Sequence, residues 1–503
     1  MDLYKLDFPI YYINLNEQTK RNINMINLFE KNKINKYVRI EAFDYKKNNI
    51  IPNKLKHPDS YIKRDVNLAE HACFTSHIFT LKKFIETTNK PYCFVFEDDI
   101  NFDFSKYYCD TFSNYILKMP NDTDILQLQF LTCKDRIKNI KNPNFYTKGD
   151  IKYNFMGTSA YLITRKYAKK ILEGIEFYKP NMINYSKLKY APVADWYLYN
   201  FTNKRYVIPL VNISLNNDST INPDPDSYKF QYESSKLVEN LWITEFIKCK
   251  SYLSNLPTIY YINRDCDIER KWAIEKQLKK FNLKFKRIEA KTPNNCSYIK
   301  QINTETIDNR EKNDLTEQEY CVTASHIKCL LEAKKNNLDE VLILEDDCSF
   351  GFVCYYKKSF CDYIKELDDD CNFIRLMCQG HPLFNLNEIK FTKEDDVNWR
   401  SNAGYYINKK GVDNILSCFK IKDNIYDAEL DDYNKDPESL QSDMANRISV
   451  DFPLLRHNLN SINPTSIQQS EKQSPTVGET VHISQLLSTD QSEDEIDTNS
   501  FQQ

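Results

Sequence analysis

The sequence predicts an α/β protein made of two tandem copies of one domain, each with a mostly parallel central sheet. Three observations predict it: sequence blocks recur at a fixed spacing, short apolar runs alternate with helix-like segments, and one apolar run in each half ends in three adjacent carboxylates. Alternating strand and helix patterns are typical of βαβ units, which build parallel sheets. Each half of the 503-residue chain is long enough to bury its own core.

The duplication is visible in four blocks that recur in the same order. "IYYINLNEQTKRN" returns as "IYYINRDCDIERK", "RIEAFD" as "RIEAKT", "EHACFTSHI" as "EYCVTASHI", and "FVFEDDI" as "LILEDDC". Each block returns about 250 residues later, a period far longer than that of a solenoid repeat. The chain therefore contains a duplicated domain.

The repeat also predicts the domain boundaries. We expect a first domain at residues 1–222, a linker with a helix at 223–256, a second domain at 257–464 and a polar tail at 465–503. The linker opens with the turn-forming "NPDPD" and continues with apolar residues at helical spacing. The tail is rich in Ser, Gln and acidic residues, a composition typical of disorder.

Composition excludes some classes of function. A formal net charge of −3 gives no basic field for binding nucleic acid. The N-terminus lacks the apolar region of a signal peptide, and no stretch is apolar enough to span a bilayer. The 15 cysteines form no paired zinc pattern, so we expect reduced, buried thiols in a cytoplasmic protein. A secreted protein with disulfide bonds is the alternative.

In each copy the predicted elements follow the same order. A buried strand at residues 10–15 or 259–262 precedes a helix-like segment, and "YVRIEAFD" predicts a second strand. "SHIFTLKKFIETTN" predicts a helix, and "YCFVFEDDI" a third strand. Ligands of open parallel sheets bind beyond the carboxyl ends of the strands, where this third strand reaches its acidic residues.

Those acidic residues are candidate metal ligands. Three adjacent acids repel one another and are poorly suited to a strand, so their recurrence indicates a divalent cation. In an extended chain the first and third acids face one side and the second the other. Mn²⁺ or Mg²⁺ takes one or two carboxylates together with diphosphate oxygens. The alternative is a solvated acidic loop. The six candidates are Glu97, Asp98, Asp99, Glu345, Asp346 and Asp347.

Other recurring positions are less specific. Ser76 and Ser325 are expected at a loop-to-helix junction, where Ser caps a helix. The neighbouring His77 contacts a nucleotide or fills the core, and both alternatives stay open. Arg21 and Arg270 bind a diphosphate or form structural ion pairs, of which the second is the commoner fate of a lone arginine.

Together these motifs resemble glycosyltransferase family 25, which includes lipooligosaccharide and collagen galactosyltransferases. The resemblance covers nearly all of both domains. It implies the nucleotide-diphospho-sugar transferase fold called GT-A, a divalent metal that is usually Mn²⁺, and transfer with inversion. It also implies a nucleotide-sugar donor, with UDP-sugar expected, and a glycan, lipooligosaccharide-like or collagen-like protein acceptor. The implied nucleotide-sugar-binding residues are Asn14, Arg21, Ser76, His77, Gly157, Thr158, Asn263, Arg270, Ser325 and His326.

The first copy fits the family pattern more closely than the second. Cys73 fits "E-x-x-C-x-x-SH", and "GTSAYLI" fits the Gly-Thr-x-Ala-Tyr segment, whereas the second copy has Val322 and "NAGYYIN" at these places. Asp195 and Asp443 fit the late acidic position. Each is the candidate base that takes the acceptor proton. For Asp195, a helix cap is an equal alternative.

Three interpretations of the duplication stay open. Both domains catalyse transfer, or one catalyses while the other binds acceptor or acts as a scaffold, or neither catalyses. Intact carboxylates in both copies favour the first, and the altered "NAGYY" segment keeps the second open. The third leaves two acidic triplets unexplained.

Overall fold

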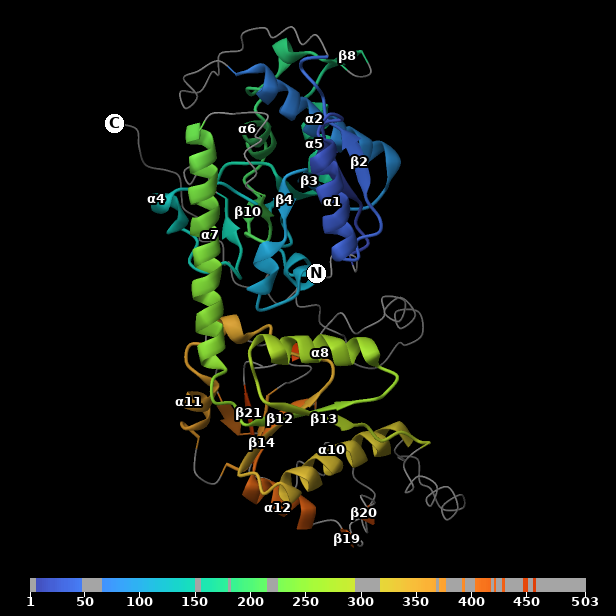
Figure 1. The fold of residues 1–503 in the computed structure, drawn as a ribbon, viewed down its shortest axis with the longest axis vertical. Helices are drawn as coiled ribbons and strands as arrows, with labels where there is room; N and C mark the ends of the chain where they lie inside the picture. The colour runs from blue at the N-terminus through green and yellow to red at the C-terminus, as the bar shows by residue number, and fades with distance from the viewer. Residues whose placement is uncertain are drawn as a thin grey trace, which may run out of the picture. The chain divides into compact units, whose positions relative to one another are not determined.

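The computed structural model describes two compact units, one reaching to Phe246 and the other beginning at Ile247 (Figure 1). Among the residues that the structure describes, no helix has the length and hydropathy needed to cross a bilayer. The described residues are 6–47, 66–149, 155–179, 182–214, 225–294, 317–367, 371–376, 391–393, 403–417, 420–421, 428–429, 447–450 and 456–457. The predicted tail at 465–503 lies outside them.

The first unit is built on a seven-stranded sheet with the order β2-β1-β3-β7-β5-β10-β6. β2, β1 and β3 are parallel neighbours, as are β5 and β10, whereas β7 is antiparallel to β3 and β5, and β6 to β10. The sheet is therefore mostly parallel, because only β7 and β6 run against the direction of the other strands. Its strands are β1 Ile10–Asn14, β2 Val38–Glu41, β3 Tyr92–Glu97, β5 Ile125–Gln127, β6 Thr147–Lys148, β7 Ala160–Thr164 and β10 Arg205–Val207.

Helices and two short strand pairs complete this unit. β4 Ile100–Asn101 pairs with β11 Asn212–Ile213, and β8 Phe177–Lys179 pairs with β9 Met182–Ile183. The helices are α1 Thr19–Lys31, α2 Leu68–Thr87, η2 Asp103–Lys106, α3 Phe112–Leu117, α4 Lys134–Ile137, α5 Arg165–Glu173, η4 Tyr185–Lys187, α6 Ala194–Tyr199 and α7 Pro225–Tyr252.

The second unit repeats the sheet of the first, strand for strand. Its order is β13-β12-β14-β18-β16-β21-β17, with parallel and antiparallel neighbours at the same places. The strands are β12 Thr258–Asn263, β13 Phe285–Glu289, β14 Glu340–Glu345, β16 Phe373–Arg375, β17 Phe391–Lys393, β18 Gly404–Asn408 and β21 Arg447–Val450. The predicted α/β class with mostly parallel sheets is confirmed in both copies.

The remaining elements of the second unit follow the same plan. The short pairs are β15 Cys348–Ser349 with β22 Arg456–His457, and β19 Lys420–Ile421 with β20 Ala428–Glu429. Its helices are α8 Ile268–Lys280, α10 Glu317–Lys335, η5 Val353–Tyr355, α11 Phe360–Ile364 and α12 Lys409–Ser417.

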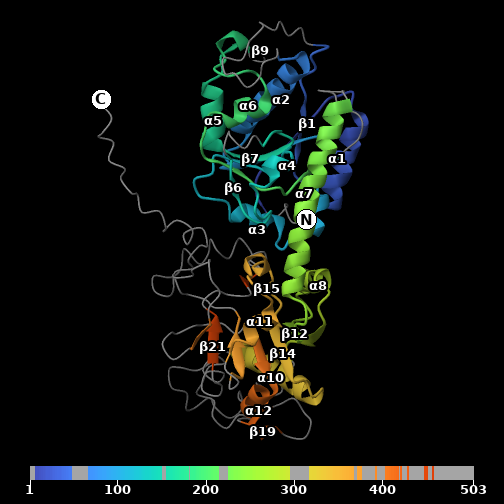
Figure 2. The same ribbon diagram turned by 90° about the vertical axis from the view of Figure 1, so that its left-hand side faces the viewer.

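The first sheet is buried on both faces, which explains the continuous apolar runs of its strands. Side chains alternate along β1, so Tyr12 enters one apolar cluster and Tyr11 another. α1 and α7 cover one face through Phe29 and Trp242, while α2, α5 and α6 cover the other. Figure 2 shows the sheet between these two groups of helices.

The helix α7 follows the first sheet in sequence and contributes to its core. The Trp242 side chain is fully buried, and its indole N–H donates a hydrogen bond to the Pro209 carbonyl at 2.7 Å. Its ring also contacts the rings of Tyr108 and Tyr115. The segment expected as a linker therefore supplies part of the first unit's apolar packing.

The expected loop-to-helix junction at Ser76 is wrong. The helix α2 begins eight residues earlier, at Leu68. There the Asn67 side chain accepts from the Glu70 N–H, and the Glu70 carboxylate accepts from the Asn67 N–H. This capping box satisfies the free N–H groups of the first turn, so the helix begins there rather than at Ser76.

Inside α2, Ser76 instead joins the helix to the chain that follows β2. Its hydroxyl donates to the Ala72 carbonyl and accepts from the Phe43 N–H, both at 2.8 Å. Ser325 lies inside α10 and makes the same pair of bonds, to the Cys321 carbonyl at 2.6 Å and from the Lys291 N–H at 2.8 Å. Ser76 and Ser325 therefore make equivalent hydrogen bonds, each joining its helix to the chain that follows the neighbouring strand.

Candidate functional site

The candidate site of the first copy forms where β3 ends. The strand ends at Glu97, and Asp98 and Asp99 form a turn that leads into β4. The expected extended alternation of the three acids is therefore wrong, because the chain turns at the second acid. β11 lies beside this turn, and the Ser214 N–H donates to the Asp99 carbonyl at 2.5 Å.

Asp98 belongs to a polar network at the carboxyl end of β1. Its Oδ1 accepts from Arg21 Nη1 at 2.8 Å, and its Oδ2 accepts from Asn14 Nδ2 at 2.6 Å. The Asn14 side-chain oxygen in turn accepts from Arg39 Nε at 2.9 Å. Burial raises the pKa of Asp98 despite the Arg21 charge. Both Asp98 oxygens are thus engaged by the protein, which does not favour its predicted role as a metal ligand.

The second copy repeats this network. Asp346 accepts from Asn263 Nδ2 at 2.7 Å and from Arg270 Nη1 at 3.3 Å, and Arg287 Nε donates to the Asn263 side-chain oxygen at 3.0 Å. Arg21 and Arg270 therefore form the structural ion pair that was the alternative to binding diphosphate. Their predicted contact with a nucleotide stays a prediction.

Asp99 has different surroundings from Asp98. Its Oδ1 is buried and has no hydrogen-bond partner in the described structure. Burial, followed by the charge of Glu97, raises the pKa of Asp99 to about 7. A buried acceptor without a donor is unfavourable, and a cation bound there would reverse that cost. Asp99 and Glu97 thus fit the oxygen ligands that Mn²⁺ or Mg²⁺ prefers.

Glu97 is held by side chains from α2 and from the segment before β7. Its Oε1 accepts from Thr158 Oγ1 at 2.9 Å and lies 3.3 Å from His77 Nε2. Burial opposes ionisation, but the bonds from His77 and Thr158 and the Arg21 charge lower the pKa of Glu97 on balance. Buried His77 also contacts the Tyr161 hydroxyl through Nδ1 at 3.0 Å. His77 is therefore buried and also holds the Glu97 carboxylate, and its predicted contact with a nucleotide stays a prediction.

Gly157 and Asp195 meet on a neighbouring part of the site. Gly157 has a φ of +100°, which favours glycine, and its N–H donates to Asp195 Oδ2 at 3.1 Å. Asp195 Oδ1 accepts from the Trp196 N–H at 2.9 Å in the first turn of α6. Burial raises the pKa of Asp195 despite these bonds. The alternative in which Asp195 caps this helix is wrong, because α6 begins at Ala194 and its N-cap is Val193; Asp195 instead fixes the glycine turn beside Thr158.

The second copy keeps the histidine and glutamate of the site. His326 Nδ1 lies 3.2 Å from the Tyr405 hydroxyl, and its Nε2 lies 3.4 Å from Glu345 Oε1. Gly404 of β18 has the register of Ala160 of β7, each opposite the residue that precedes the strand-end glutamate. Asn402 and the candidate base Asp443 lie outside the described residues.

Two kinds of residue in the site were not predicted as site residues, a tyrosine and an arginine in each copy, although both belong to repeated motifs. Tyr161 and Tyr405 orient the histidines, and Arg39 and Arg287 hold the asparagines of the network. The tyrosine recurs in "GTSAYLI" and "NAGYYIN", and the arginine begins both "RIEA" blocks. Recurrence of a polar side chain in both copies was the signal that could have found them.

One protein-family model matches both copies. The model described as Glycosyltransferase family 25 (LPS biosynthesis protein) matches residues 8–240 and 256–432, which is more than half of the chain. The chain belongs to glycosyltransferase family 25. Each matched region contains one acidic triplet, so family 25 membership extends to both candidate sites. The predicted tandem family 25 domains are confirmed, and the chain is a glycosyltransferase.

Similar solved structures add little to this family 25 assignment. "A197 from STIV" is 12% identical with a TM-score of 0.21, and covers 40% of this chain and 84% of its own. The apo structure of WbbM, a bifunctional glycosyltransferase, is 8% identical with a TM-score of 0.20 and covers 82% of each chain. At such TM-scores neither likeness carries an argument. No curated protein sequence matches the chain.

Proposed function

We propose that the chain is a metal-dependent, inverting glycosyltransferase that moves a sugar from a nucleotide-sugar, expected to be a UDP-sugar, to a hydroxyl of a glycan or glycoprotein. The observation that carries this proposal is the buried Asp99 Oδ1, which has no donor in the described structure and lies in the same acidic turn as Glu97. In a glycosyltransferase, an acidic pair of this kind is suited to a cation that binds the donor diphosphate.

Glu97 and Asp99 would hold Mn²⁺ or Mg²⁺ in this proposal. When bound, the metal neutralises the negative charge that develops on the departing nucleoside diphosphate. Asp98 has a supporting task, because Arg21 and Asn14 already occupy its oxygens and thereby fix the acidic turn against β1. Glu97 is held in place by Thr158 and His77.

Asp195 is the proposed base of the first domain. Transfer with inversion requires a group that takes the proton of the acceptor hydroxyl opposite the leaving diphosphate. The Gly157 and Trp196 N–H groups hold the Asp195 carboxylate, which restricts its rotation. Its raised pKa makes it a stronger base than an ordinary aspartate. Asp443 has the same proposed role in the second domain.

A second candidate function concerns the second domain alone. Its Arg270 side chain is 38% exposed against 14% for Arg21, and Val322 replaces Cys73. These departures support the alternative in which the second domain binds acceptor or acts as a scaffold. Cys73, Cys93 and Cys329 are free thiols, which supports a cytoplasmic location for either function.

The test is a donor assay with metal removed and restored. Purified full-length protein, treated with chelator, is incubated with UDP- and GDP-sugars and released nucleoside diphosphate is recorded with and without Mn²⁺. We expect release that depends on Mn²⁺ and is lost in Asp99→Asn. Asp103→Asn, an exposed carboxylate in the following turn, is the matched control. Release that survives chelation, or that Asp99→Asn leaves unchanged, would count against the proposed metal chemistry.

A further inference from the structure

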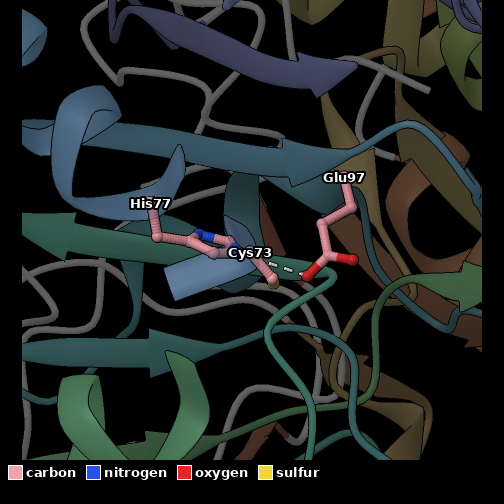
Figure 3. Close-up of side chains that lie close together, drawn as sticks. All are labelled: Cys73, His77 and Glu97. Atoms are coloured by element: carbon pink, nitrogen blue, oxygen red, sulfur yellow. Dashed lines mark hydrogen bonds and ion pairs between the residues drawn. The ribbon is translucent and has the colours of Figure 1, made fainter. Parts of the chain in front are cut away.

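A thiol, an imidazole and a carboxylate converge beside the acidic turn of the first domain. Cys73 and His77 are one helical turn apart on α2, and Glu97 ends β3 opposite them. One ligand atom from each residue lies within 4.8 Å of the others. Figure 3 shows the three side chains pointing toward one another.

The spacing suits one tetrahedral metal ion. With zinc-to-ligand bonds of about 2.0–2.3 Å, the ligand atoms of a tetrahedral site are themselves about 3.5 Å apart. His77 Nε2 and Glu97 Oε1 already lie 3.3 Å apart, and the set is complete once Cys73 Sγ, within 4.8 Å of both atoms, closes to about 3.5 Å. Three protein ligands leave a fourth position for water or substrate.

The neighbouring residues are those that a metal-binding histidine and carboxylate require. Tyr161 contacts His77 Nδ1, the ring nitrogen that faces away from Cys73 and Glu97, and Thr158 donates to the Glu97 carboxylate. Such outer partners fix the orientation of the ligands. When a metal binds, the Cys73 thiol proton passes to solvent, and neutral His77, which donates from Nε2 to Glu97 in the empty site, changes to the tautomer with its proton on Nδ1, facing the Tyr161 oxygen.

We propose that Cys73, His77 and Glu97 form a second metal site that binds Zn²⁺, and that Zn²⁺ bound there inhibits the first domain. A thiolate and an imidazole select Zn²⁺, whereas the oxygen ligands of Glu97 and Asp99 select Mn²⁺ or Mg²⁺. Because both sites use Glu97, occupation of one removes a ligand from the other. Zinc binding stands on the geometry alone, and its inhibitory effect rests on the proposed function of Glu97.

The duplication provides an internal control. The second domain keeps the other two groups, with His326 Nε2 3.4 Å from Glu345 Oε1, but Val322 stands where Cys73 stands in the first. The second domain therefore lacks the thiol of this proposed site, and Zn²⁺ should spare it. Cys73→Val gives the first domain the residue that the second already has, and Val322→Cys does the reverse.

Cobalt is the probe for the site, because Co²⁺ occupies zinc sites and its bond to a thiolate gives a charge-transfer absorption band. Full-length wild type, Cys73→Val and the double variant Cys73→Val/Val322→Cys are titrated with Co²⁺ and then with Zn²⁺. We expect the band in wild type, its loss in Cys73→Val and its return in the double variant. Affinity for Zn²⁺, measured by displacement of Co²⁺, should fall at least about 100-fold in Cys73→Val, since even outer-shell changes cost about 10–100-fold.

A second measurement addresses inhibition. At saturating Mn²⁺, Zn²⁺ should reduce nucleoside diphosphate release by wild type and leave Cys73→Val much less affected. No cobalt band in wild type, an unchanged band in Cys73→Val, or no return in the double variant would overturn the zinc site. A cobalt band without zinc inhibition would keep the site but refute the shared role of Glu97. If the protein releases no nucleoside diphosphate from any donor, the cobalt spectra still test whether Cys73 belongs to a metal site.

Discussion

At the end of β3, Asp98 and Asp99 are adjacent and chemically identical, yet the fold gives them different surroundings. Asp98 accepts hydrogen bonds from Arg21 and Asn14, while Asp99 Oδ1 is buried without a donor in the described structure. Asp98 thus has a structural task, whereas Asp99 is the residue to which the proposed function assigns metal binding. Substitutions at the two positions should differ in kind, one affecting stability and the other metal-dependent activity.

Replacing Asp98 should destabilise the first domain more than the equivalent change destabilises the second. Asp98→Ala removes an acceptor that Arg21 and Asn14 share and should cost about 3 kcal/mol of local opening free energy, as breaking a buried pair does. Asp346→Ala should cost only about 1 kcal/mol, because Arg270 is 38% exposed and pairs at 3.3 Å. Hydrogen exchange read by mass spectrometry resolves opening in each domain. Equal protection losses in both variants would contradict the difference in burial.

At saturating Mn²⁺, which would keep Asp99 ionised, the proposed base should set the acid limb of the pH profile. Asp195 acts as a carboxylate, so turnover should fall as pH drops through its pKa. Burial raises that pKa above the ordinary aspartate value, so the fall should occur at higher pH than for an exposed aspartate. Asp195→Asn keeps an oxygen for the Gly157 N–H but cannot take a proton, and should lower turnover by about 10²–10⁴-fold.

Asp135→Asn is the control for that variant, because Asp135 is exposed on α4. It should leave both the rate and the acid limb unchanged. If Asp195→Asn lowers the rate but keeps the acid limb, Asp195 supports the glycine turn and another group accepts the proton.

At the scale of elements, α2 organises the site of the first domain. It begins at a capping box and carries both His77 and Ser76, which reach Glu97 and the chain after β2. Its counterpart α10 carries His326 and Ser325 in the same way. The same helix therefore supplies structural and candidate binding groups in both copies.

Removing the cap should loosen the start of α2 without disturbing the site. Asn67→Ala removes the acceptor of the Glu70 N–H and should cost about 1 kcal/mol, whereas Asn67→Ser keeps a capping oxygen. Hydrogen exchange of the amides in the first turn of α2 should be faster in Asn67→Ala than in wild type, and unchanged in Asn67→Ser. Ser76 and His77 lie two turns further on, so faster exchange there as well would mean that the cap controls the whole helix.

At the scale of the whole molecule, the question is whether both domains transfer sugar. The two acidic turns share the Arg–Asp–Asn network, but Cys73 has no thiol counterpart in the second domain. Both domains belong to family 25 and both keep the triplet. This pattern supports the proposal that both domains are active.

Single variants of each triplet test this division. Asp99→Asn and Asp347→Asn should each remove part of the nucleoside diphosphate release from a panel of donors, and the double variant should remove all of it. A different donor spared in each single variant would establish a bifunctional enzyme. If Asp99→Asn abolishes release and Asp347→Asn has no effect, the second candidate function is correct and the second domain is a binding or scaffold module.

Much of this organisation could be predicted from the sequence because the relevant signals are local or repeated. The strand that ends at Glu97 is an apolar run long enough to be recognised. The recurrence of four sequence blocks predicted the tandem domains. Ser76 was placed wrongly because its side chain also suits a helix cap, and only the stronger box at Asn67 decides where α2 begins. Composition does not reveal which of two polar residues caps a helix.

The sequence by itself determined the duplication, the α/β class, the family and the acidic residues at the strand ends, because each depends on residue order along one segment. Only the tertiary structure decided which acid is held and which is left without a donor, since Arg21, Asn14 and Asp98 come from three elements distant in sequence. It also brought Cys73 and His77 of α2 beside Glu97 of β3. Contacts between elements depend on how the sheet and helices pack, which no local pattern encodes.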